Sequence, residues 1–118
     1  MADKGFNIKV LVPTEDGFTI SEQGIENAPY YLCYNISNRS YQLAEKHKAR
    51  EIFNDKSENV TAINDIVIKL KIDFILCKTE NNAVRCGFIK PQTNEINKML
   101  NILIDMVDQK KELLFFNQ

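Results

Sequence analysis

The first part of the chain alternates apolar and polar residues with a period of two. Residues 8–12 alternate in this way and predict a strand, which Pro13 ends because proline has no amide hydrogen to donate. Residues 30–34 are rich in aromatic side chains and follow Pro29, so they predict a second strand. Residues 40–45 alternate after a polar turn and predict a third strand, paired with the second as a hairpin. We therefore expect an antiparallel meander.

Helical spacing replaces this alternation in the middle of the chain. Residues 46–58 are charged and polar and predict a connecting loop, with one helical turn at 49–53. A helix is expected over 59–70, with Ser57 or Asn59 as its cap and these residues on its buried face: Val60, Ile63, Ile66, Val67 and Leu70. Residues 74–77 form a short apolar run typical of a buried strand. A helix followed by such a strand indicates a parallel crossover.

The last third predicts one more strand and a long helix. Residues 83–86 predict a helical turn, and residues 87–90 predict a strand that Pro91 stops. Thr93 is the expected cap of a helix with these residues inward: Ile96, Met99, Leu100, Leu103, Met106 and Val107. The prediction is an α/β fold, a mixed five-stranded sheet flanked by helices. Residues 113–116 are apolar without helical spacing, and could pack on the domain or meet another subunit.

Length, charge and hydropathy limit the kinds of protein that this chain can be. The 118 residues predict a single domain, 1–118, with a core at about 6–110. Fifteen basic and 16 acidic residues nearly cancel, which argues against binding to nucleic acid or anionic lipid through bulk charge. No apolar run is long enough to span a membrane, so we expect a cytoplasmic protein with its three cysteines reduced.

Two cysteines are the candidate metal ligands. Cys77 closes the buried strand and Cys86 follows a few residues later, so both could approach the edge where the carboxyl ends of the strands open. Together they could supply two thiolates to a soft metal, although packing as small apolar side chains is the favoured alternative. Cys33 is expected in the core, and His47 in a solvated loop. Since no nucleophile, base and orienting group fall together, we expect no enzyme activity.

One stretch is similar to a known family. A strand, the Asp16-Gly17 turn, Thr19-Ile20-Ser21-Glu22 and then Ala28-Pro29-Tyr30-Tyr31 resemble the dinitrogenase iron-molybdenum cofactor biosynthesis family, whose small domains bind or carry metal-sulfur clusters. The resemblance covers residues 8–34 and continues more weakly to about 107. It implies a ribonuclease H-like topology and a non-enzymatic carrier or insertion accessory for an iron-molybdenum or iron-sulfur cluster. The implied partner is a cluster donor or acceptor protein. Candidate cofactor-binding residues are Ser21, Gln23, Cys77 and Cys86, with Cys77 and Cys86 as the metal ligands.

The chain also departs from this family in three places. Gln23 stands where the family has a histidine, residues 78–82 replace a glycine-rich loop, and residues 53–57 replace a second glycine-rich segment. These changes support a second hypothesis, in which a degenerate member no longer binds metal. Such a protein would act as an interaction module through its last helix and residues 113–116.

Overall fold

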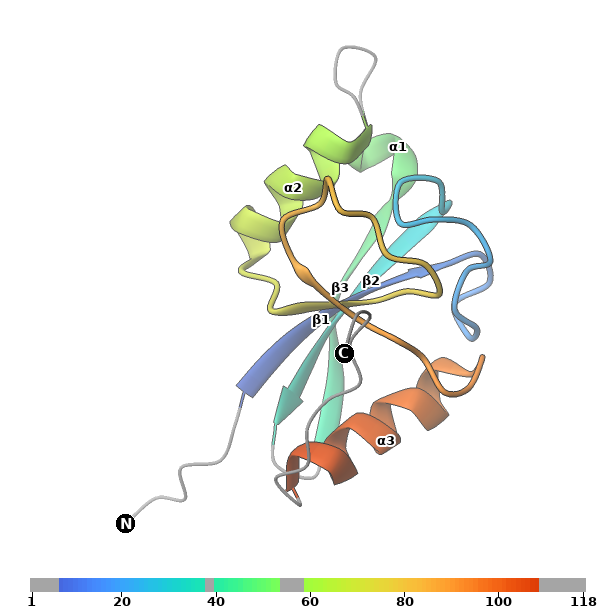
Figure 1. Ribbon diagram of the computed structural model, residues 1–118, viewed down its shortest axis with the longest axis vertical. Coiled ribbons are helices and arrows are strands. Elements are labelled where there is room, and N and C mark those ends of the chain that lie inside the picture. The colour runs from blue at the N-terminus through green and yellow to red at the C-terminus, as the bar shows by residue number, and fades with distance from the viewer. Residues whose placement is uncertain (1–6, 38–39, 54–58, 109–118) are drawn as a thin grey trace.

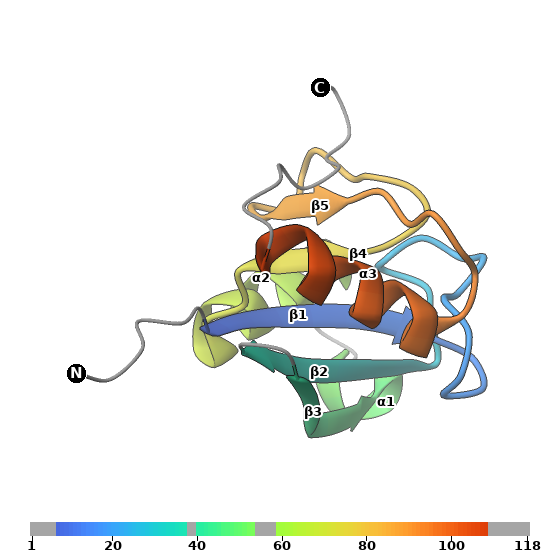
Figure 2. The same ribbon diagram turned by 90° about the horizontal axis from the view of Figure 1, so that it is seen from below.

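A five-stranded sheet forms the centre of the protein (Figure 1). The structure is a computed structural model that describes residues 7–37, 40–53 and 59–108. The strands lie in the order β3-β2-β1-β4-β5, which Figure 2 shows from below. Their bounds are β1 Asn7–Thr14, β2 Tyr30–Ser37, β3 Ser40–Lys48, β4 Phe74–Leu76 and β5 Gly87–Ile89. The first three strands are antiparallel, whereas β1, β4 and β5 run parallel. The predicted α/β fold, with a mixed sheet in ribonuclease H-like topology, is therefore confirmed.

Pro13 does not end β1, contrary to the sequence prediction. Pro13 lies within the strand opposite Tyr31, and its carbonyl accepts a hydrogen bond from the Ser21 N–H at 2.9 Å. That carbonyl, and the nitrogen that lacks a hydrogen, face away from β2. The parallel pairing with β4 ends earlier, at Leu11 and Ile75, so the missing donor costs no ladder hydrogen bond.

The third strand is longer than predicted. It continues through the charged residues Lys46 to Lys48, which the sequence places in a loop, and pairs along the full length of β2. As the outer strand of the sheet, β3 exposes much of its surface, so polar side chains do not oppose strand formation there. His47 consequently lies in β3 and is half-buried. The predicted helical turn is confirmed as α1, Ala49–Ile52.

Two longer helices cover opposite faces of the sheet (Figures 1 and 2). Helix α2, Asn59–Leu70, has the predicted bounds and packs on the face that carries Leu11, Tyr31 and Ile75. Helix α3, Ile96–Asp108, packs on the face that carries Val12 and Leu76. Cysteine 33 is buried under α2, which confirms its predicted place in the core.

The predicted helix ends need correction at Thr93 and Met106. Glu95, not Thr93, immediately precedes α3, because the Glu95 carbonyl accepts the Met99 N–H at 3.0 Å. Met106 is half-buried at the margin of the packed face, the Val107 side chain lies outside the described residues, and Ile104 is buried instead. Ser57, one of the two predicted α2 caps, also lies outside the described residues.

Residues 83–86 do not form the predicted helical turn. The Val84 N–H donates to the Asn81 carbonyl and the Cys86 N–H donates to the Val84 carbonyl, each at 3.0 Å. These are separate tight turns, because the chain must extend again at Gly87 to pair with Phe74. In the described part of the chain, no helix is long and apolar enough to cross a membrane.

Candidate functional site

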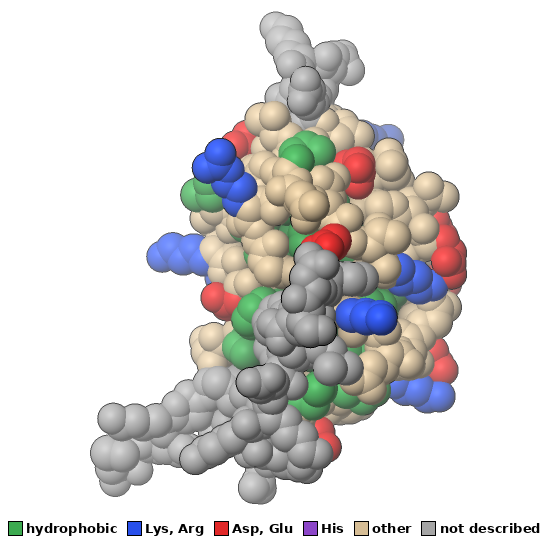
Figure 3. Space-filling model, in the orientation of Figure 1, with side chains coloured by type: hydrophobic (Ala, Val, Ile, Leu, Met, Phe, Trp, Pro, Cys, Tyr) green, Lys and Arg blue, Asp and Glu red, His purple; other side chains and the backbone are tan. Residues whose placement is uncertain are grey.

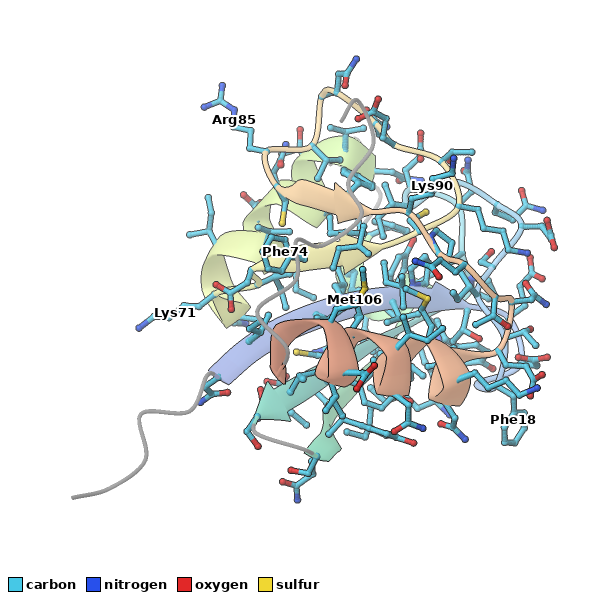
Figure 4. All side chains as sticks on the ribbon, turned by 60° about the horizontal axis from the view of Figure 1, so that its bottom comes forward. Phe18, Lys71, Phe74, Arg85, Lys90 and Met106 are labelled. Atoms are coloured by element: carbon cyan, nitrogen blue, oxygen red, sulfur yellow. The ribbon has the colours of Figure 1, made fainter. Side chains whose placement is uncertain are left out.

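The carboxyl ends of β1, β4 and β5 meet at one edge of the sheet. We define the carboxyl edge as residues 15–29, 77–82 and 90–95, which follow these three strands. Lys90 and Phe18 lie at this edge in Figure 4, whereas Lys71 and Arg85 lie at the opposite end. Open α/β sheets commonly bind ligands outside the carboxyl ends of their strands. The sequence candidates can therefore be judged by which of them reach this edge.

A network of hydrogen bonds fixes the turn that begins the carboxyl edge. Thr14, which is fully buried, donates from Oγ1 to the Thr19 carbonyl at 2.6 Å and accepts the Gly17 N–H at 2.9 Å. The Asp16 carboxylate accepts the N–H groups of Phe18 and Thr19, each at 2.8 Å. Gly17 has a φ of 86°, where other residues are strained. The turn is thus built to hold one backbone shape.

Asp16 should make this turn sensitive to acid. The backbone N–H groups of Phe18 and Thr19 lower the pKa of Asp16 from its ordinary 3.8. A lowered pKa in the folded state contributes stability above the ordinary pKa, and this contribution is lost as the pH falls through the lowered value. We expect urea unfolding of wild type and Asp16→Asn to differ at pH 6 and to converge as the pH falls through the lowered pKa of Asp16. A difference that stays constant with pH would contradict this assignment.

Ser21 and Gln23 both lie at the carboxyl edge, in different environments. Ser21 is 1% exposed; its Oγ accepts the Gln23 N–H at 3.0 Å and donates to Glu15 at 3.3 Å. Ser21 thus forms a serine turn, and its hydroxyl is already engaged in these two hydrogen bonds. The Gln23 side chain is exposed. Of these two candidates, only Gln23 presents its side chain to solvent.

Cys77 lies at the carboxyl edge but is fully buried on the α2 side of the sheet. Burial raises the pKa of its thiol, whereas the N–H groups of Thr79 and Lys78 lower it, and the Glu26 carboxylate raises it further. Glu26 is itself held by Asn81, whose Nδ2 donates to its carboxylate at 3.0 Å. Cys77 is therefore a protonated, covered thiol in this conformation, and the residues packed around it would have to move before a metal reached it.

Cys86 lies at the opposite end of β4 and β5, so the predicted thiolate pair does not form. Phe74 pairs with Gly87, which places Cys86 beside Asp73, and the Cys86 thiol lies 3.5 Å from the Asp73 carbonyl. Cys77 is four residues further along the strands, or about 13 Å at the usual rise of a strand. Two thiolates that share one metal ion lie within about 4 Å of each other. The two thiols are far apart because β4 and β5 are parallel, so the connection between them returns the chain to the end of the sheet where β4 begins.

The two buried thiols and the half-buried Cys86 thiol should react slowly with alkylating reagents. Burial raises the pKa of Cys86 to about 11 from its ordinary 9.0, and it also raises the pKa values of Cys33 and Cys77. Since the thiolate is the nucleophile, we expect Cys86 to react with iodoacetamide at pH 8 about 100-fold more slowly in the native protein than in urea. Peptide mapping by mass spectrometry measures each site. Labelling of native Cys77 ahead of Cys86 would be inconsistent with its complete burial.

The carboxyl edge contains a hollow that the sequence candidates do not include. Its volume is about 290 Å³, and its lining is formed by Lys78, Lys90, Pro91, Gln92, Thr93 and Asn94. Lys90 directly follows the buried strand β5, and Lys78 follows Cys77 at the end of β4. This position after a buried strand is the sequence signal that could have identified both lysines. Lys78 also forms an ion pair with Glu22, next to Gln23. We name this feature the lysine hollow.

Several contacts join the first turn to the lysine hollow. The Ile20 N–H donates to the Asn94 carbonyl, and the Ile96 N–H donates to the Phe18 carbonyl, both at 2.9 Å. Phe18 itself is 73% exposed beside them. Charged side chains of both signs are interspersed over the face in Figure 3. Within 7–37, 40–53 and 59–108, no three His, Cys, Asp or Glu side chains are grouped to hold a metal ion.

Comparisons with known proteins support the fold. No family model matches the sequence, and no curated protein matches it. Among solved structures, the fold resembles that of a protein from Methanocaldococcus jannaschii that carries the provisional name dinitrogenase. The two chains are 18% identical, the match covers 96% of this chain and 98% of the other, and the TM-score is 0.61. At this identity the likeness shows a shared fold over nearly the full length of both chains.

Proposed function

We propose that this protein is a non-enzymatic carrier or insertion accessory for a metal-sulfur cluster, of the iron-molybdenum or iron-sulfur type, and that the cluster docks at the lysine hollow. The observation that carries the proposal is the position of Lys78 and Lys90 at the carboxyl ends of two parallel strands, beside a hollow of about 290 Å³. The resemblance of residues 8–34 and the likeness in fold to a protein with the provisional name dinitrogenase support it.

The chemistry of the hollow favours capture through charge and hydrogen bonds. Clusters built from sulfide and thiolate ligands carry net negative charge, which two ammonium groups attract. Thr93, Asn94 and Gln92 add a hydroxyl and two amides at the rim. No chelating pair of cysteines is needed for this mode, in agreement with the separation of Cys77 from Cys86. A carrier must also release its cargo, and weak contacts of this kind permit release.

Anaerobic titration with iron-molybdenum cofactor or with iron and sulfide tests the proposal, followed by visible absorbance and metal analysis. We expect stoichiometric uptake by wild type. Cys77→Ser and Cys86→Ser are matched variants, because each replaces one sulfur by oxygen at opposite ends of the sheet. Uptake by Cys86→Ser should equal that of wild type. Loss of uptake in Cys77→Ser alone would mean that the Cys77 thiolate binds the cluster in addition to the charged contacts.

The second candidate is an interaction module that binds no metal, and exposed Phe18 favours it. An aromatic side chain that is 73% exposed on a rigid turn resembles the anchor of a protein contact. The predicted contact residues 113–116 lie outside the described residues. Colourless, metal-free wild-type protein after titration would reject the carrier proposal. Loss of partner capture in Phe18→Ala would then support the module.

A further inference from the structure

A second cavity lies on the face of the sheet opposite α3, and the proposed function does not use it. It is a groove of about 240 Å³ between β3, α1 and α2. The groove exists because α2 packs over the centre of the sheet, while β3 extends beyond it as the outer strand. Helix α1 closes the space between them. We name this feature the β3 groove.

The β3 groove has an apolar floor and a charged rim. Its floor includes Ile52, Ile66 and Leu70, and its rim carries three carboxylates, those of Glu45, Glu51 and Asp65. His47 and Lys69 also line it. Two of the carboxylates already have partners: Glu45 contacts His47 at 2.9 Å, and Glu51 accepts the Lys48 N–H at 2.9 Å. Each of these contacts uses one oxygen of the carboxylate, Oε1.

Strand register explains why negative charge predominates in the groove. Glu45 pairs with Cys33 and His47 pairs with Tyr31, and both partners are buried under α2, so Glu45 and His47 face the groove. Lys46 pairs with Leu32 and faces the opposite side of the sheet, where its Nζ lies 5.0 Å from the Tyr30 ring centre. With Glu51 of α1 and Asp65 and Lys69 of α2, three carboxylates and one lysine line the groove. With His47 neutral, the net charge is −2.

The charged side chains of the groove are not arranged as a metal site. In the part of the chain that the structure describes, these side chains are not grouped closely enough to hold a metal ion. They surround an apolar floor instead, which is the usual design of a site for a small organic molecule. We propose that the β3 groove binds a small organic cation, an amine or amidine on an apolar body. The apolar body covers the floor, and the charged group lies among the carboxylates.

A matched series of three probes tests this proposal. Benzamidine, benzamide and benzoate share one ring and differ in charge: positive, neutral and negative. We expect benzamidine to shift the amide resonances of β3, α1 and α2 in the ¹⁵N-labelled full chain, and to bind at least ten-fold more tightly than benzamide. Benzoate should not bind. Equal binding of benzamidine and benzamide, or no shift at these amides at millimolar concentration, would overturn the proposal.

Variants locate the charge that the probe recognises. Glu51→Gln with Asp65→Asn keeps the size of both side chains and should weaken benzamidine binding at least ten-fold. Glu95→Gln is the control, because it removes an exposed carboxylate that pairs with Lys98 far from the groove. The amide spectrum of each variant reports whether it is folded. Equal losses in the double variant and the control would reject a specific role for the groove carboxylates.

An arginine from a partner protein is the other occupant to be tested. N-acetylarginine methylamide presents that side chain without a partner protein. Binding weaker than that of benzamidine is expected, because its aliphatic stem covers less of the floor. Tighter binding than benzamidine would overturn the assignment to a free small molecule. Because the groove and the lysine hollow share no residue, failure of either proposal leaves the other intact.

Discussion

Replacing Ile75 by alanine is expected to lower the free energy of unfolding by about 2–5 kcal/mol. Ile75 is fully buried in β4, between Leu11 of β1 and Phe88 of β5, and it packs under α2. Loss of its outer carbon atoms removes apolar contacts and leaves a cavity that neighbouring strands cannot close. Since a domain of this size is stable by about 5–15 kcal/mol, the change should be visible as a large fall in the urea midpoint.

Ile68→Ala is the matched control for this prediction. Ile68 is 74% exposed on α2, so the same change in chemistry removes little buried surface. Alanine also has the higher helix propensity, and the free energy of unfolding should change by less than about 0.5 kcal/mol. Similar losses in both variants would mean that α2 does not cover β4 in the way described.

The largest functional effect is expected from Lys78→Gln combined with Lys90→Gln. If the lysine hollow captures an anionic cluster, removal of both ammonium groups should weaken uptake at least ten-fold, which corresponds to about 1.4 kcal/mol. The loss arises from two charge-assisted contacts, and it should shrink at high salt because exposed charges are screened. Glu22 loses its ion-pair partner, but its side chain is 72% exposed and remains hydrated. Anaerobic titration followed by absorbance measures the effect.

Lys71→Asn combined with Arg85→Gln is the control for charge. Both residues lie at the end of the sheet opposite Lys90 in Figure 4, so this variant removes the same net charge at a distance from the hollow. Lys71 has a φ of 58°, a conformation that asparagine tolerates well. Cluster uptake by this variant should match wild type. An equal loss would attribute binding to overall charge and reject the lysine hollow as the site.

Local sequence patterns were enough to predict most of the helices and strands and the α/β class of the fold. Period-two alternation at residues 8–12 and helical spacing from Val60 to Leu70 are local patterns that directly reflect which face of each element is buried. The predictions failed where a neighbouring strand determined the local structure. Pro13 continues a strand because its missing donor faces away from β2, and Lys46 to Lys48 extend β3 because β2 supplies hydrogen bonds to their backbone.

Which functional side chains meet could not be predicted from local patterns, because it depends on the tertiary structure. Cys77 and Cys86 are near in sequence, but a parallel connection places them at opposite ends of the sheet, since parallel strands must begin at the same end. Lys78 and Lys90 are further apart in sequence, yet for the same reason they line one hollow. The β3 groove likewise depends on how far the outer strand extends past α2. Strand direction and packing, which are long-range properties, therefore set the candidate sites.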